Sequence, residues 1–134
     1  MAVAGWIPFN SPVVDLKGVP LAVLLRDDAG TMLGGLLGHT SGGWLIVDVL
    51  WLPAELRGGG LGARLMADGE AEARRRGCIG VHLNTGSFQA PGFYERLGYE
   101  VCGVIDDFPR RHKRITFSKR LSSIPAENGE AALG

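Results

Sequence analysis

The stretch "LRGGGLGARL", from Leu56 to Leu65, decides the interpretation of the whole chain. It follows the apolar run "WLIVDVLWL", Trp44 to Leu52, and opens a segment with helical periodicity. Glycines let a backbone approach a ligand closely, and the first N–H groups of a helix have no partners inside that helix. The pattern therefore predicts a strand, a glycine-rich loop and a helix that offers an anion-binding site at its start.

The helix is predicted over Leu61–Arg76, because apolar residues recur near one of its faces and Gly77 is a natural stop. The next segment, Cys78–Asn84, alternates apolar and other residues and is predicted to be a strand. A strand, a helix and a second strand in this order form a unit whose two strands run parallel.

The remaining elements flank this unit. The chain predicts an antiparallel meander before it and, after it, a short helix and a closing antiparallel pair. The meander strands are Leu21–Arg26, Met32–Thr40 and Trp44–Leu52; the helix is Pro91–Leu97; the closing strands are Tyr99–Ile105 and Arg114–Leu121. The fold class is therefore α/β of the α+β kind, a mixed and mostly antiparallel sheet with one central parallel pair.

Length and composition limit the number of domains, the location and the partners that we expect. With 134 residues the chain is predicted to form one domain over 1–121, with an irregular lead-in at 1–19 and a disordered polar tail at 122–134. The formal net charge of zero argues against nucleic acid as a partner. No signal peptide and no apolar run of about 20 residues is visible, so we expect a cytoplasmic protein without a membrane partner. The two cysteines, Cys78 and Cys102, lack metal-ligand spacing and are predicted to be buried, reduced thiols, with no metal in the site.

The glycine-rich loop fits neither of two common nucleotide-binding motifs. No Gly-Lys-Ser/Thr closes it, which excludes a P-loop, and it lacks the G-x-G-x-x-G pattern with a distal acidic residue. Arg57 to Gly62 reads R-x-x-G-x-G instead, and "APGFYERLGYE" follows from Ala90 to Glu100. In this order and separation the two blocks resemble the GNAT superfamily of N-acetyltransferases over Leu21 to Leu121. The segment "SFQAPGFYERLGYE" resembles a subgroup of small bacterial members.

This resemblance implies acetyl-CoA as co-substrate. The central parallel strands would splay and admit the pantetheine arm, whose amides would pair with the backbone of Leu50, Trp51 and Leu52. The pyrophosphate would lie on the loop amides of Arg57, Gly58, Gly59, Gly60, Leu61, Gly62 and Ala63. Tyr94 would protonate the departing thiolate. Ser87 and Ala90 complete the implied cofactor set, although the family often has asparagine where Ser87 stands. The N-terminal elements are also shorter than is usual in the family.

The sequence leaves the general base open. Asp48 is a carboxylate in an apolar strand, where it is expected to share a face with Trp44, Ile46 and Leu50. Burial of a carboxylate is costly unless it is paired or used, so Asp48 either lines the acceptor site or pairs structurally. Two histidines are weaker candidates: His82 within a strand, and His39, which we expect to be a surface residue.

The sequence thus predicts transfer of an acetyl group to a primary amine of a small molecule by direct attack on the thioester. Acetylation of a protein or peptide amine and a non-catalytic coenzyme A-binding module are the alternatives. The acceptor and the oligomeric state are left open; a homodimer would cover edge strands and complete the acceptor wall.

Overall fold

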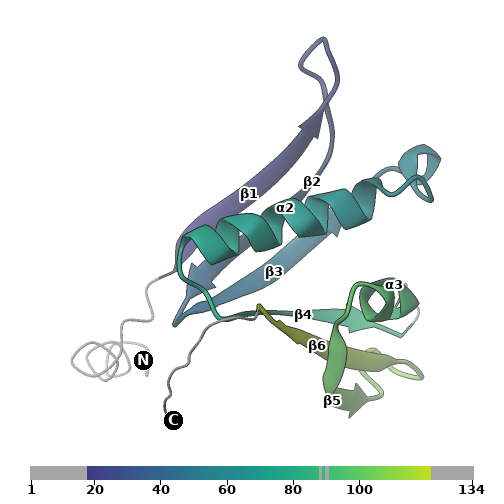
Figure 1. Ribbon diagram of the computed structural model, residues 1–134. Helices are drawn as coiled ribbons and strands as arrows, with labels where there is room; N and C mark the ends of the chain where they lie inside the picture. The colour runs from purple at the N-terminus through teal and green to yellow at the C-terminus, as the bar shows by residue number, and fades with distance from the viewer. Residues whose placement is uncertain (1–17, 88, 90, 122–134) are drawn as a thin grey trace, which may run out of the picture.

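The computed structural model describes residues 18–121, with the exception of residues 88 and 90. Within these residues six strands form one sheet in the order β1-β2-β3-β4-β6-β5 (Figure 1). The strand β3 pairs with β4 in parallel, and the other neighbours in the sheet are antiparallel. The predicted fold class is confirmed. The predicted lead-in up to residue 17, the tail at 122–134, and Phe88 and Ala90 lie outside the described residues.

The meander forms as the turns predict. Its strands are β1 (Val19–Arg26), β2 (Met32–Ser41) and β3 (Trp44–Trp51). Asp27 Oδ1 accepts backbone hydrogen bonds from Ala29 and Thr31 in the first turn, which fixes the hairpin between β1 and β2. The short 3-10 helix η1 (Ala54–Leu56) then leads from β3 into the glycine-rich loop.

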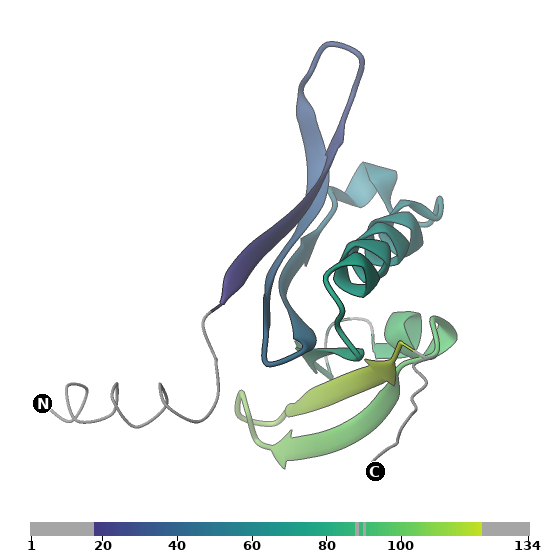
Figure 2. The ribbon, with the colours of Figure 1, turned by 60° about the vertical axis from the view of Figure 1, so that its left-hand side comes forward.

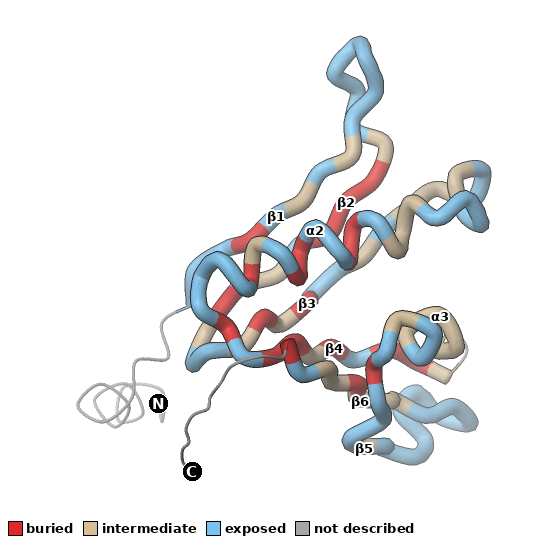
Figure 3. Tube along the Cα trace, viewed as in Figure 1, coloured by how far each residue is buried: buried red, intermediate tan, exposed pale blue. Residues whose placement is uncertain are grey.

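The helix α2 (Leu61–Arg75) lies across the meander and buries its apolar face against it (Figures 1 and 3). Gly69 brings the helix close to β2, because a Cβ there would lie 3.1 Å from Cδ1 of Leu36. The buried side chains between helix and sheet include Leu36, Leu45, Leu65 and Met66. Packing of this face, rather than helix propensity, supplies most of a helix's stability.

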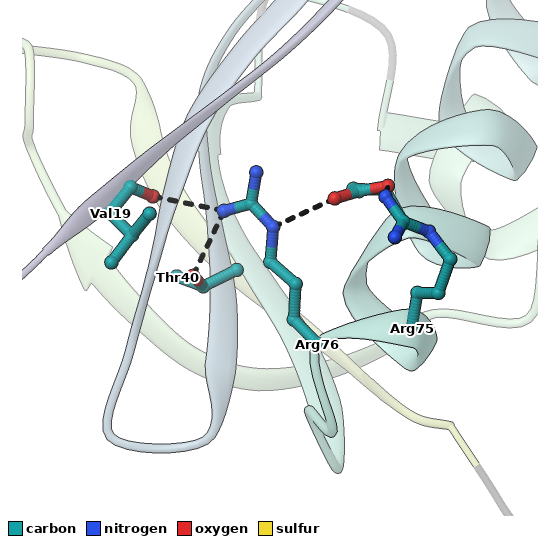
Figure 4. Close-up of polar contacts among 5 residues, drawn as sticks. Val19, Thr40, Arg75 and Arg76 are labelled. Carbon is teal, nitrogen blue, oxygen red and sulfur yellow. Dashed lines mark hydrogen bonds and ion pairs between the residues drawn. The ribbon is translucent and has the colours of Figure 1, made fainter.

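The carboxyl end of α2 is tied to the meander by Arg76 (Figure 4). Its guanidinium donates to the carbonyl oxygen of Val19 at 3.3 Å and to Oγ1 of Thr40 at 3.2 Å. Its Nε donates to Glu72 at 2.9 Å, and Arg75 also donates to that carboxylate. Gly77 follows with φ of 82°, the left-handed stop that the sequence predicts.

The second half of the chain consists of β4 (Gly80–Gly86), α3 (Pro91–Arg96), β5 (Glu100–Asp106) and β6 (Lys113–Arg120). The helices α2 and α3 lie on the same side of the sheet (Figure 2). The fourth strand begins at Gly80 rather than at Cys78, because the N–H of Cys78 is bound by the carbonyl of Ala73 as the helix ends. Within the described residues, no helix is both long and apolar enough to cross a membrane.

One cysteine prediction is wrong. Cys78 is buried and free, as predicted, but Cys102 is free and exposed. It lies in β5, the outermost strand, where the pairing with β6 skips from Val101 to Gly103 and leaves Cys102 as the extra residue of a bulge. Nothing in the described chain packs on that edge, so Cys102 is exposed although its neighbours in the sequence are apolar.

A buried polar contact joins α2 to the second half. Glu70 is 7% exposed, and it accepts a hydrogen bond from the Tyr99 hydroxyl at 2.7 Å. Lys119 Nζ lies 3.1 Å from the same carboxylate and also donates to the carbonyl of Leu97 at 2.9 Å. The carboxylate, hydroxyl and ammonium thus satisfy one another in a site that excludes most water.

Candidate active site

The two parallel strands separate partway along their length. Their register runs from Trp44 opposite Gly80 to Val47 opposite Leu83 and ends there. The strand β3 continues to Trp51 and β4 to Gly86, and Figure 1 shows the two strands diverging in this direction. The backbone of β3 beyond Val47 therefore has no partner strand on its β4 side within the described chain, which leaves an edge that an extended ligand can pair with.

The glycine-rich loop follows this open edge. Gly58 and Gly60 both have φ of 87°, a left-handed conformation that other residues adopt only with strain. Gly60 is also the N-cap of α2, where no side chain caps the helix, and the first turn contains no acidic residue. The first N–H groups of α2 therefore have no side-chain cap, at the positive end of the helix dipole, which is the arrangement that binds anions.

The side chain of Arg57 has a structural role. Its Nε donates to the carbonyl oxygen of Leu52 at 3.0 Å, which ties the start of the loop to the residue after β3. This hydrogen bond holds the start of the loop against the end of the open strand edge.

These parts surround a cleft of about 860 Å³. That volume lies in the range of sites for small molecules and cofactors. Lining residues from the predicted cofactor set are Leu50, Trp51, Leu52, Arg57, Gly58, Gly60, Gly62, Ala63 and Tyr94. Gly59 and Leu61 belong to the same loop but do not line the cleft. Gly62 permits a close approach, because a Cβ there would lie 3.2 Å from Cζ of Phe93.

Coenzyme A fits the chemistry of this cleft. A pyrophosphate needs several N–H donors without competing carboxylates, and the start of α2 offers them. A pantetheine arm carries amides that pair with an extended backbone, and β3 offers an unpaired one beyond Val47. The cleft lies between these two features.

Tyr94 reaches the cleft from α3. Its ring packs against Phe93, Tyr99 and Phe117, with centroids 5.0, 6.0 and 5.7 Å away. Burial raises the pKa of its hydroxyl above the ordinary value of about 10, so the hydroxyl keeps its proton at neutral pH. No hydrogen bond engages this hydroxyl among the residues that the structure describes. It is a half-buried hydroxyl at the wall of the cleft.

Ser87 lies elsewhere. Its Oγ accepts a hydrogen bond from the N–H of Lys113 at 2.9 Å, and it does not line the cleft.

The sequence did not single out Gln89, which lines the cleft and holds the end of β4. Gln89 Oε1 accepts from the N–H of Gly86 at 2.7 Å and from the Thr85 hydroxyl at 3.0 Å. No sequence signal marks this role, because glutamine three residues after a strand has many uses.

The burial expected for Asp48 is wrong, but Asp48 is paired, which is one of the two predicted alternatives. The register of β3 with β2 skips from Val49 opposite Leu37 to Val47 opposite Gly38, so Asp48 is the extra residue of a bulge. Its side chain is 51% exposed, and Oδ2 lies 2.9 Å from Nδ1 of His39. The bulge also turns Leu50 to the other face. Asp48 is thus paired but not buried, and His39 is its partner.

Three comparisons place these features among known proteins. The family model described as "Acetyltransferase (GNAT) family" matches residues 10–99. The blasticidin-S acetyltransferase of Streptomyces morookaense is 46% identical over 102 residues, 75% of each chain. The crystal structure of an acetyltransferase from Bacillus cereus is 30% identical, covers 90% of this chain and 86% of its own, and has a TM-score of 0.79. An aminoglycoside 6′-N-acetyltransferase solved with coenzyme A shares the fold at 19% identity, a TM-score of 0.69, and coverage of 92% of this chain and 82% of its own.

Proposed function

The chain belongs to the GNAT family of acetyltransferases, and from this premise we propose that it transfers an acetyl group from acetyl-CoA to a primary amine of a small molecule. The observation that carries the proposal is one cleft that combines an open strand edge, an uncapped helix start and the Tyr94 hydroxyl. Each matches a different part of acetyl-CoA: the pantetheine amides, the pyrophosphate and the sulfur.

The cofactor contacts follow from this cleft. Leu50, Trp51 and Leu52 present the backbone for pantetheine, and the loop from Arg57 to Ala63 presents N–H groups for the pyrophosphate. The Ser87 hydroxyl still has a proton to donate, because its oxygen accepts from Lys113, and Ala90 stays in the proposed set through the family resemblance. The aminoglycoside acetyltransferase of the same fold was crystallised with coenzyme A, which supports the same ligand here.

Tyr94 is proposed as the general acid. A thiolate leaves the acetyl carbon when the amine attacks, and a neutral hydroxyl at the cleft wall can donate a proton to that sulfur. The raised pKa of Tyr94 keeps this proton in place at neutral pH. The closely packed rings around Tyr94 hold the hydroxyl in position.

A small molecule is the proposed acceptor, because the first of the relatives above is named for the antibiotic blasticidin S. The test is a thiol-release assay with acetyl-CoA and a panel that contains blasticidin S, simple primary amines and lysine-bearing peptides, with mass spectrometry of the products. We expect acetylation of at least one small amine. If only peptides are acetylated, the acceptor is a peptide amine and not a small molecule. If coenzyme A binds but no acceptor causes thiol release, the chain is a coenzyme A-binding module.

A further inference from the structure

The sheet has two faces with different roles. Leu45 and Val47 point to the face that α2 and α3 cover, where they are buried, whereas Ile46 points to the opposite face. No helix covers that opposite face anywhere in the described part of the chain. His39 is directly opposite Ile46 in the register of β2 with β3, so its side chain lies on this open face.

A carboxylate lies on the same face. Alternation from Ile46 places Asp48 there, and its Oδ2 lies 2.9 Å from Nδ1 of His39. A carboxylate only accepts hydrogen bonds, so Nδ1 carries the proton and Nε2 of the neutral ring keeps its lone pair. The pair is accessible, with 39% of the His39 side chain and 51% of the Asp48 side chain exposed.

The pair also lies where the sheet opens. Val47 is the last residue of β3 that pairs with β4, and Asp48 is the next residue. The cleft is lined from the helix side by Gly62, Phe93 and Tyr94. Asp48 is two residues from Leu50, which lines the cleft, so the pair lies beside the place proposed for the acyl donor.

From this arrangement we propose that His39 is the general base for the attacking amine and that Asp48 orients its ring; this rests on the proposed function. Nε2 takes a proton from the amine nitrogen as the nitrogen–carbon bond forms. The carbon–sulfur bond breaks, and Tyr94 donates its proton to the sulfur. The imidazolium then returns its proton to solvent, and the Tyr94 oxygen takes one from solvent, so both groups are restored.

Among the groups around His39, one carboxylate can orient its ring. Pro20 of β1 and Ile46 of β3 are its neighbours across the sheet, and neither titrates. Gly18 lies beside the ring, where a Cβ would be 3.3 Å from Cδ2. Asp48 is the charged side chain in contact with the ring.

The experiment compares three variants in the full-length chain with acetyl-CoA and the amine that the panel identifies. His39→Gln should lower kcat by about 10²- to 10⁴-fold, the usual contribution of a general base, with an unchanged Kd for acetyl-CoA. Asp48→Asn should lower kcat less and leave the KM for acetyl-CoA unchanged, because the ring keeps its basic nitrogen but loses the carboxylate that orients it. Added imidazole should partly restore His39→Ala, since the site is open to solvent.

His82→Gln is the matched control. His82 lies in the same row, opposite Ile46 from the β4 side, and contacts the Trp44 ring with centroids 6.0 Å apart rather than a carboxylate. Its loss should leave kcat within a few-fold of the parent. Unchanged turnover in His39→Gln, or an equal loss in His82→Gln, would overturn this inference alone. A parent protein that acetylates no amine would overturn the proposed function, and the base assignment with it.

Discussion

The hydroxyl of Tyr99 donates a 2.7 Å hydrogen bond to the buried carboxylate of Glu70 and so joins the segment that follows α3 to the middle of α2. Burial, together with that carboxylate, raises the pKa of Tyr99 far above its ordinary value. Tyr94 lies beside it, with ring centroids 6.0 Å apart, but lines the cleft. We therefore propose different roles for two neighbouring tyrosines: Tyr99 in stability and Tyr94 in the chemistry of the proposed function.

Removal of each hydroxyl should separate these roles. Tyr99→Phe should lower the free energy of unfolding by about 1–3 kcal/mol, because the buried carboxylate loses a partner, and should leave kcat nearly unchanged. Tyr94→Phe should change stability by less than about 0.5 kcal/mol and lower kcat by about 10²- to 10⁴-fold. Urea unfolding and thiol release measure the two quantities. Equal effects of both variants on both quantities would contradict the division.

The glycine-rich loop gives a comparison between adjacent residues. Gly60→Ala should raise the KM for acetyl-CoA by about 5- to 30-fold, because a left-handed alanine costs about 1–2 kcal/mol and shifts the loop away from its binding form. Gly59→Ala is the control, since Gly59 lacks a positive φ and a Cβ there meets no atom within 4 Å. The same rise in KM for both variants would show that chain flexibility, and not the left-handed turn, sets the affinity.

The end of α2 should weaken in acid. Hydrogen bonds from Arg76 and Arg75 lower the pKa of Glu72 below its usual value of about 4.5. A lowered pKa means that the folded state favours the ionised form, so the contribution is complete above the unfolded pKa and is lost as pH falls through the folded pKa. The Tm difference between the parent and Glu72→Gln should therefore shrink from about pH 6.5 to about pH 3.

Asp68→Asn is the control for this acid effect. Asp68 lies on the same helix in an exposed ion pair with Arg64, whose nitrogen is 3.7 Å away. Its Tm difference from the parent should be small at both pH values, because exposed pairs contribute little. A Tm difference for Glu72→Gln that stays constant with pH would remove the electrostatic explanation.

The open face contains one site that is closely packed. The ring of Trp44 lies over Gly80, so a Cβ at residue 80 would collide with it. Gly80→Ala should lower the free energy of unfolding by about 1–3 kcal/mol through overpacking. Gly103→Ala is the control, because its Cβ would meet Thr116 at an ordinary 3.8 Å. Denaturation curves for the two variants that coincide would contradict the packing argument.

Sequence periodicity predicted every strand and both α-helices of the described chain, because local alternation and turn residues determine them directly. The parallel pair was predictable as well, since a strand, a helix and a strand leave few other arrangements. The predicted start of β4 was two residues early, because the stop of α2 at Gly77 uses the backbone of Cys78. The prediction for Cys102 was wrong because exposure of an edge strand depends on what packs beside it.

The candidate site was less predictable than the fold. The loop was predictable from its glycines, but the partner of Asp48 was not, because the register between β2 and β3 includes a bulge that alternation along one strand does not reveal. Gly38, directly before His39, is the signal that could have indicated it, since an isolated glycine in a strand often marks a bulge. Gln89 acts through Thr85 and Gly86, and its residue type alone does not indicate these contacts.

The extra residue in β3 divides this strand into two stretches, each with its own alternation of side chains between the two faces of the sheet. Before Asp48, Leu45 and Val47 are part of the core. After Asp48, Leu50 and Trp51 line the cleft, and the face to which each points follows the register after the bulge. Leu50 lines the cleft and also packs against the core, whereas Trp51 lines the cleft and is half exposed. Deletion of Asp48 would leave regular pairing, in which Val49 and Leu50 keep Leu37 and Leu36 as their partners, and would remove only the extra side chain. The bulge therefore adds one side chain to the open face of the strand without changing the faces that pairing with β2 gives to the residues on either side of it.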